Sequence, residues 1–242
     1  MSECPYAHGA GANARVAVMY ENRHHFRESL RELERQTLGG LDMVLGQLDH
    51  VLESVSGDNV ELADLVAADD DRIDGRYLEV HQGLLSLLAR EAPVAGDLRI
   101  VVALLVVIRC MERMGDQCVN IAKLVRLSDQ DAPKDGDMLA TIERMGRLAR
   151  SQVAQAKQAF TTRHVALAQH LIGLGGEVNR LNREIHYRAV EVGEAVAVRE
   201  WAMCMILVAR CLERVAGNAT DIAEQTIFVV TGRLGEAGGG SA

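Results

Sequence analysis

The sequence predicts an all-α protein that folds as two pseudo-symmetric antiparallel three-helix bundles. Apolar residues make up 48% of the 242-residue chain and aromatic residues only 3%, a composition typical of long packed helices. The only prolines are Pro5, Pro93 and Pro133, so long stretches are free of helix breakers. A phrase also occurs twice, as RCMERMGDQCVNIAK at 109–123 and as RCLERVAGNATDIAE at 210–224. This repeat indicates two related halves.

Apolar residues recur at spacings of three and four along six segments, as expected for amphipathic helices. These segments are 22–55, 59–90, about 97–127, 138–161, 163–192 and 194–232. Pro93 ends the second helix, Asp97 opens the third, and the polar stretch 128–137 separates the halves. Short connections make neighbouring helices antiparallel. We therefore predict a flexible tail at 1–20, a first bundle at 21–128, a second bundle at 129–233 and a disordered tail at 234–242.

The charge and the cysteines limit the classes of function. A formal net charge of −8 argues against nonspecific nucleic-acid binding, which needs a basic face. Five cysteines without a CxxC motif indicate reduced thiols in a cytosolic protein. The apolar runs 100–108 and 201–209 are about half the ~20 residues that cross a bilayer. We therefore expect a cytoplasmic protein that reaches the membrane only through partners.

Acidic residues on two successive helices form a candidate metal site. Glu112 and Asp116 are four residues apart and therefore share one helix face. Asp70 and Asp74 form a second such pair on the preceding helix. Both pairs lie 19–23 residues from Pro93, so a hairpin folded there brings the four carboxylates to one level.

Four carboxylates so close together have unfavourable electrostatics. Two unit charges about 5 Å apart repel by about 1–3 kcal/mol, which raises a carboxyl pKa, splays the side chains or recruits a cation. All-oxygen sites suit magnesium, calcium, manganese or iron. The alternative is an ordinary solvated acidic face, in which Arg109 and Arg113 pair with Glu112.

Motifs of catalysis and of anion binding are absent from the sequence. It has no Gly-rich phosphate loop, no nucleophile elbow and no Cys/His zinc spacing. No motif therefore predicts that this chain senses phosphate by itself. The candidate metal motifs also lack a histidine, lysine or nucleophile, which weighs against an enzyme.

The repeated phrase resembles a known family signature. ERMGDQCVNIAK at 112–123 resembles the ERIGDxxxNIA signature of PhoU-type phosphate-signalling regulators. The segment 93–99 resembles that family's PxxxDLR, and the second copy continues to a VTG ending at 230–232 that is similar to the family's second motif. His25 and Phe26 also match the start of the first helix. The resemblance spans about residues 20–233.

The resemblance implies a fold, a role and partners. The fold would be two three-helix bundles related by pseudo-symmetry. The role would be that of a noncatalytic cytoplasmic regulator that represses phosphate-starvation genes when phosphate is plentiful. Its partners would be the ATPase of the Pst phosphate ABC transporter and a PhoR-like sensor histidine kinase, and family habit suggests a homodimer. Some members bind multinuclear iron or other divalent ions through paired E/DxxxD motifs, so the implied cofactor is iron, manganese, magnesium or zinc.

The two halves differ in the acids that the family's paired motifs require. The first bundle keeps all four. In the second, Glu213 persists, but Gly217 stands at the position of Asp116. Aligning the halves places Gly175 and Asn179 at the other two positions.

This loss of acids leads to a prediction about metal binding. The first bundle can hold a metal cluster and the second cannot, although Glu177 and Asp221 are nearby acids that compensate in part. Two other functions stay open at this point. One is a metal-handling or metal-dependent helical enzyme that uses the acidic cluster, and the other is a helical-bundle partner unrelated to phosphate.

Overall fold

The computed structural model describes residues 9–57, 60–91, 93–128, 134–193 and 195–233, and it describes their side chains from residue 23 onward except at residues 60 and 67. Every element within these residues is an α-helix, which confirms the predicted fold class. The helices are α1 (Gly9–Gly57), α2 (Val60–Arg90), α3 (Ala95–Leu127), α4 (Gly136–Thr162), α5 (Val165–Glu191) and α6 (Val196–Thr231).

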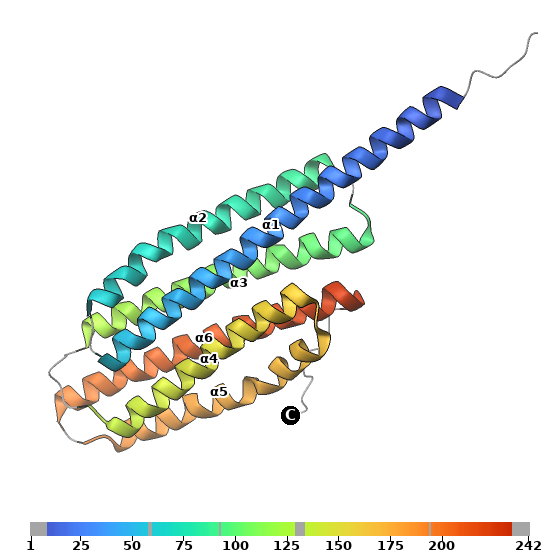
Figure 1. The fold of residues 1–242 in the computed structure, drawn as a ribbon. Coiled ribbons are helices and arrows are strands. Elements are labelled where there is room, and N and C mark those ends of the chain that lie inside the picture. The colour runs from blue at the N-terminus through green and yellow to red at the C-terminus, as the bar shows by residue number, and fades with distance from the viewer. Residues whose placement is uncertain (1–8, 58–59, 92, 129–133, 194, 234–242) are drawn as a thin grey trace, which may run out of the picture.

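The helix α1 begins earlier than the sequence predicts. Residues 9–20 are helical, so the prediction of a flexible tail through residue 20 is wrong for this stretch. The segment carries several alanines and no proline, a composition that is compatible with a helix. Figure 1 shows the start of α1 projecting past the other helices. The other predicted tail residues, 1–8 and 234–242, lie outside the described residues.

The remaining helix boundaries follow local signals. Asp135 caps α4 by accepting a hydrogen bond from the backbone N–H of Met138 at 2.8 Å, and His164 caps α5 through Leu167 at 2.9 Å. Such caps satisfy backbone donors that lack an intrahelical partner. The helix α6 ends at Thr231 and is capped by Gly232, whose φ is +74°, a conformation that glycine adopts without strain.

The six helices are arranged so that the two bundles share a wide contact. Within the first bundle α1, α2 and α3 pack together, and within the second α4, α5 and α6 do the same. Between the bundles, α1 packs on α4 and α3 packs on α6. The helices α2 and α5 therefore lie at the two outer edges (Figure 1). The two helices that carry the repeated phrase are direct neighbours.

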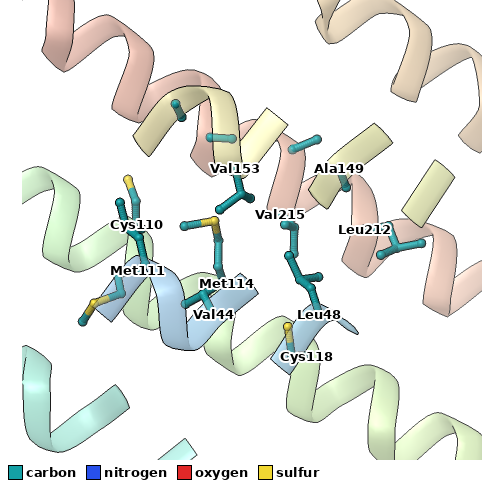
Figure 2. Packing of buried hydrophobic residues seen from close by; sticks show 14 of the residues in the cluster. Val44, Leu48, Cys110, Met111, Met114, Cys118, Ala149, Val153, Leu212 and Val215 are labelled. Carbon is teal, nitrogen blue, oxygen red and sulfur yellow. The ribbon is translucent and has the colours of Figure 1, made fainter. Parts of the chain in front are cut away.

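The hydrophobic core runs through both bundles without a break. Figure 2 shows Val44 of α1, Met114 of α3, Val153 of α4 and Val215 of α6 gathered where four helices meet. All four side chains are fully buried. A continuous apolar core stabilises the contact through the area that it removes from water. The inter-bundle contact is therefore part of the core of the molecule.

Ion pairs along α1 and α4 flank this core. Three link the two helices: Asp49 with Arg150, Asp42 with Lys157, and Glu34 with Arg163. The residue numbers fall along α1 as they rise along α4, so the two helices run antiparallel. None of the described helices combines the length and apolar character needed to traverse a lipid bilayer.

Candidate functional site

The predicted acidic cluster lies where α2 and α3 approach closely. Gly115 is buried in this contact. A Cβ atom at Gly115 would lie 3.3 Å from the Oδ1 atom of Asp70 and 3.3 Å from the Cγ2 atom of Ile73. Because Gly115 has no side chain, the backbone of α3 can approach the carboxylate of Asp70. This close approach lies directly beside Asp116, the next residue of α3.

Mutual repulsion and burial shift two of the carboxyl groups. Burial, followed by repulsion from Asp74 and then Asp116, raises the pKa of Asp70 to about 6. Burial and then the charge of Asp116 raise the pKa of Glu112, and the Arg109 guanidinium opposes this shift. These couplings bring all four predicted acids into one electrostatic environment. A raised carboxyl pKa is one of the three outcomes that the sequence analysis allows for this cluster.

The acids do not converge on a single point. Among the residues that the structure describes, no three His, Cys, Asp or Glu side chains are arranged to hold a metal ion. Asp74 and Asp116 are exposed, while Asp70 and Glu112 are half-buried. The donors are the hard oxygens that divalent cations prefer, and a cation here would require the exposed carboxylates to turn towards the buried ones.

The second bundle has a hollow at the equivalent place. The positions that replace the acids lie together around a cavity of about 270 Å³ between α5 and α6, which Gly175, Asn179, Glu213 and Gly217 line with Asp221. A Cβ atom at Gly175 or Gly217 would have no atom within 4 Å. The missing side chains thus leave open space.

The retained acid of the second bundle is already paired. Glu213 forms an ion pair with Arg210, three residues before it on α6. Asp221 has a raised pKa because it is partly buried, and Arg113 opposes that shift. Glu177, the other nearby acid, pairs with Arg144 of α4 at 2.6 Å and does not line this hollow. Of the two nearby acids, only Asp221 is placed to compensate.

A larger cavity, of about 510 Å³, lies between the bundles and was not predicted. Its lining comes from both copies of the repeated phrase: Arg109, Glu112, Arg113, Asp116 and Gln117 of α3, with Arg214, Gly217, Asn218 and Asp221 of α6. The repeat spacing of 101 residues makes Arg113 equivalent to Arg214 and Gln117 equivalent to Asn218. This equivalence is the feature of the sequence from which the cavity could have been predicted. Such a prediction would also have required the knowledge that α3 and α6 pack side by side.

Three of the four cysteines in the described residues, Cys110, Cys118 and Cys211, are buried in the core, and Cys204 is partly buried. Cys110, Cys118, Cys204 and Cys211 are free thiols, as the sequence predicts. Burial raises the pKa of Cys110 to about 12 and raises that of Cys118 as well. Because the thiolate is the reactive form, these buried groups serve as small core residues. Figure 2 shows Cys110 and Cys118 on α3 among the packed side chains.

The fold and the site define a class of protein: an all-helical pair of three-helix bundles with an acidic cluster in one bundle and a charged cavity between them. The PhoU domain matches residues 40–125 and 142–226, one match in each bundle. The chain belongs to the PhoU family, and the resemblance noted from the repeated phrase is confirmed.

Several relatives are similar over most of their length. The chain is 30% identical over 210 residues to "Phosphate-specific transport system accessory protein PhoU homolog 1" of Thermotoga maritima, covering 86% of this chain and 90% of the relative. It is 25% identical to the PhoU homolog of Clostridium acetobutylicum, covering 87% and 96%.

Two crystal structures share the fold. PhoU from Streptococcus pneumoniae matches with a TM-score of 0.80 at 23% identity, over 87% of this chain and 99% of that one. PhoU from Pseudomonas aeruginosa matches with a TM-score of 0.76 at 22% identity, over 86% and 100%. At this level of identity the likeness establishes the arrangement of helices.

Proposed function

We propose that this protein is a noncatalytic regulator of phosphate uptake and of phosphate-starvation signalling. The observation that carries the proposal is the match to relatives named as accessory proteins of the phosphate-specific transport system, which extends over 86% of this chain in one case and 87% in another. Both bundles and the contact between them fall within that span. We therefore assign to this chain the function of a complete accessory protein of phosphate transport.

The proposed mechanism is protein contact in the cytoplasm. One surface engages the ATPase of the Pst phosphate transporter and another engages a PhoR-like sensor histidine kinase, so that plentiful phosphate biases the kinase towards repression. Each bundle exposes large apolar side chains near the turn between its second and third helices. These are Leu85, Leu98 and Val102 in the first bundle and Val190, Val196 and Met203 in the second. Exposed apolar groups of this kind support a role in partner binding.

Gene deletion tests this proposal most directly. In phosphate-rich medium, a deletion strain should express alkaline phosphatase that the parent strain represses, and a plasmid copy of the gene should restore repression. Unchanged expression in the deletion strain would overturn the proposal. Co-purification with the transporter ATPase and with the kinase tests the two contacts separately.

The assembly of the protein belongs to the same proposal. We expect a homodimer that uses one of these apolar surfaces, since a self-association through them would cover side chains that are otherwise exposed. Sedimentation equilibrium of the purified protein measures the mass directly. A monomer at all concentrations tested would remove the dimer from the proposal and leave the two partner contacts standing.

A second candidate function is metal binding in the first bundle. The raised pKa of Asp70 and of Glu112 favours it, because a cation would neutralise the repulsion that causes part of both shifts. Asp70, Asp74, Glu112 and Asp116 would hold iron, manganese, magnesium or zinc, and the metal would cross-link α2 to α3.

Matched variants of the two bundles test the metal site. Metal analysis and thermal melting should show bound metal, and a metal-dependent rise in Tm, in the natural protein and in Glu213→Ala. Both should be lost in Asp116→Ala. Loss of metal in Glu213→Ala alone would contradict the placement of the site. Metal-dependent phosphatase activity that disappears in Glu112→Ala would instead favour an enzyme.

A further inference from the structure

Within the part of the chain that the structure describes, three arginines of the cavity between α3 and α6 form no direct ion pair. No ion pair within 4 Å joins Arg109, Arg113 or Arg214 to an acid, whereas many other arginines in the described residues form such pairs. Arg210 shows the contrast, because it occupies the position of Arg109 in the second repeat and pairs with Glu213. Guanidinium groups are suited to bidentate binding of phosphate and carboxylate. The charges of Arg109 and Arg113 act on Glu112 and Asp221 of the same lining, but no direct ion pair occupies the three guanidinium groups, so they can bind an oxyanion.

A buried amide points to a ligand independently of the arginines. Gln117 lines the cavity with only 6% of its surface exposed. Among the described residues, its side chain has no hydrogen-bond partner. The amide atoms of Gln117 are not among the fully buried polar atoms that lack a partner, so they reach the water of the cavity, and a ligand there can replace that water as their hydrogen-bond partner. Its repeat equivalent Asn218 donates to the carbonyl of Arg214 at 2.8 Å and lines the opposite wall.

The carboxylates of the same lining decide what kind of oxyanion fits. Glu112, Asp116 and Asp221 line the same cavity as the three arginines. A bare anion would be attracted by one set and repelled by the other. A phosphate group that carries Mg²⁺ satisfies both, because Mg²⁺ binds through one or two carboxylates together with phosphate oxygens and keeps several waters.

The size and lining of the cavity further limit the chemical class of the ligand. About 510 Å³ is within the range of small-molecule sites and leaves room for a hydrated cation beside one or more phosphate groups. The lining holds no aromatic and no large apolar side chain, so nothing is placed to stack against a nucleobase.

We propose that the cavity between the bundles binds inorganic phosphate or a short polyphosphate as its Mg²⁺ complex. Arg113 and Arg214, one from each repeat, hold the phosphate oxygens, and Gln117 donates to them. This inference rests on the proposed function only for the choice of phosphate among oxyanions. A ligand held by both repeats would also couple the two bundles across α3 and α6.

Isothermal titration calorimetry of the full chain tests the proposal. The probes are sodium phosphate, tripolyphosphate and ATP, each with and without MgCl₂, and sodium sulfate with MgCl₂. We expect one site per chain for phosphate or tripolyphosphate that requires Mg²⁺. Whichever of these two probes binds more tightly identifies the physiological ligand. Binding of ATP alone, equal binding of sulfate, or no binding at millimolar concentrations would overturn the proposal.

Variants locate the site. Arg113→Gln and Arg214→Gln should each weaken binding about tenfold or more, as expected for the loss of a charge-assisted hydrogen bond. Arg210→Gln is the matched control and should bind like the natural protein. If either variant melts early, Arg→Lys at that position keeps the charge and removes the bidentate geometry, and it should still weaken binding. Unchanged affinity in the Arg113 and Arg214 variants would overturn the assignment.

The binding experiments test the ligand site separately from the proposed regulatory role. Loss of binding with normal derepression of alkaline phosphatase in the deletion strain would remove the ligand and leave the regulator. Specific binding in a protein whose deletion changes no phosphate-regulated gene would keep the site and remove that role.

Discussion

Arg163 at the end of α4 donates a 2.6 Å hydrogen bond to Glu34 of α1, although 129 residues separate the two in the chain. The two side chains are only 27% and 20% exposed, and the pair bridges the two bundles. Arg163 also lies over the ring of Phe160, with 4.5 Å from its Cζ atom to the ring centroid. Its own backbone has a φ of +54°, where side chains other than glycine are strained. One residue therefore combines stabilising contacts with an unfavourable conformation.

Two substitutions at this position separate the opposing effects. Arg163→Ala removes the ion pair and the cation–π contact but keeps the strained backbone, so we expect a loss of about 1–3 kcal/mol. Arg163→Gly removes the same contacts and relieves the strain, so it should be about 1 kcal/mol more stable than Arg163→Ala. Urea unfolding measures both. An alanine variant as stable as the glycine variant would show that the backbone strain is negligible.

The cap of α4 offers a second prediction. Asp135 accepts from the backbone of Met138 and pairs with Arg188 of α5 at 3.1 Å. Asp135→Ala loses both and should destabilise the protein by about 0.5–2 kcal/mol. Asp135→Asn keeps the cap and should lose less. The Arg188 hydrogen bonds hold the pKa of Asp135 below its usual value, so its charge stabilises the fold above the unfolded pKa and less as pH falls. Chemical denaturation at neutral and acidic pH should therefore show the natural protein and Asp135→Asn converging in acid.

Asp70 should have the opposite pH dependence. Its pKa is raised from 3.8 to about 6 in the folded protein, so the folded state binds its proton more tightly than the unfolded state. Its contribution to stability therefore grows as pH falls from about 6 to about 4 and is lost as pH rises through 6. Asp70→Asn removes this dependence and should be more stable than the natural protein at pH 7. Unfolding in EDTA across pH 4–7 measures it.

The exposed Glu79→Gln, on the same helix, is the control for that experiment and should leave the pH profile unchanged. Besides Asp74 and Asp116, Asp71 also raises the Asp70 pKa, while Lys123 lowers it. Parallel pH profiles for Asp70→Asn and the natural protein would show that repulsion in the cluster does not act on folding.

The helices could be predicted from sequence because each is defined by local pattern. Apolar spacing and breaks such as Pro93 placed five of the six helices within a few residues of their observed bounds. The start of α1 was wrong because residues 9–20 have no apolar stripe to mark them, and helix propensity alone extends the helix. The acids Glu112 and Asp116 were found because a spacing of four is visible along one helix.

The inter-bundle cavity could not be predicted in the same way. Arg113 and Arg214 belong to different halves, and nothing local shows that α3 packs against α6 rather than against another helix. The repeat identifies the residues that are equivalent in the two halves, but it does not show which of them are adjacent in the folded protein. A pseudo-symmetric contact places equivalent residues around one cavity, and only the packing of the core reveals that contact.

Two glycines of the repeated phrases make a last, contrasting prediction. A Cβ atom at Gly115 would press on Asp70 and Ile73 at 3.3 Å, so Gly115→Val must push α2 away from α3 and should cost about 1–3 kcal/mol. A Cβ atom at Gly217 meets nothing within 4 Å, so Gly217→Ala should gain up to about 1 kcal/mol from helix propensity. Thermal melting of both variants tests the pair. A stabilised Gly115→Val would mean that α2 and α3 are not held in close contact, and a destabilised Gly217→Ala would mean that the hollow in the second bundle is filled.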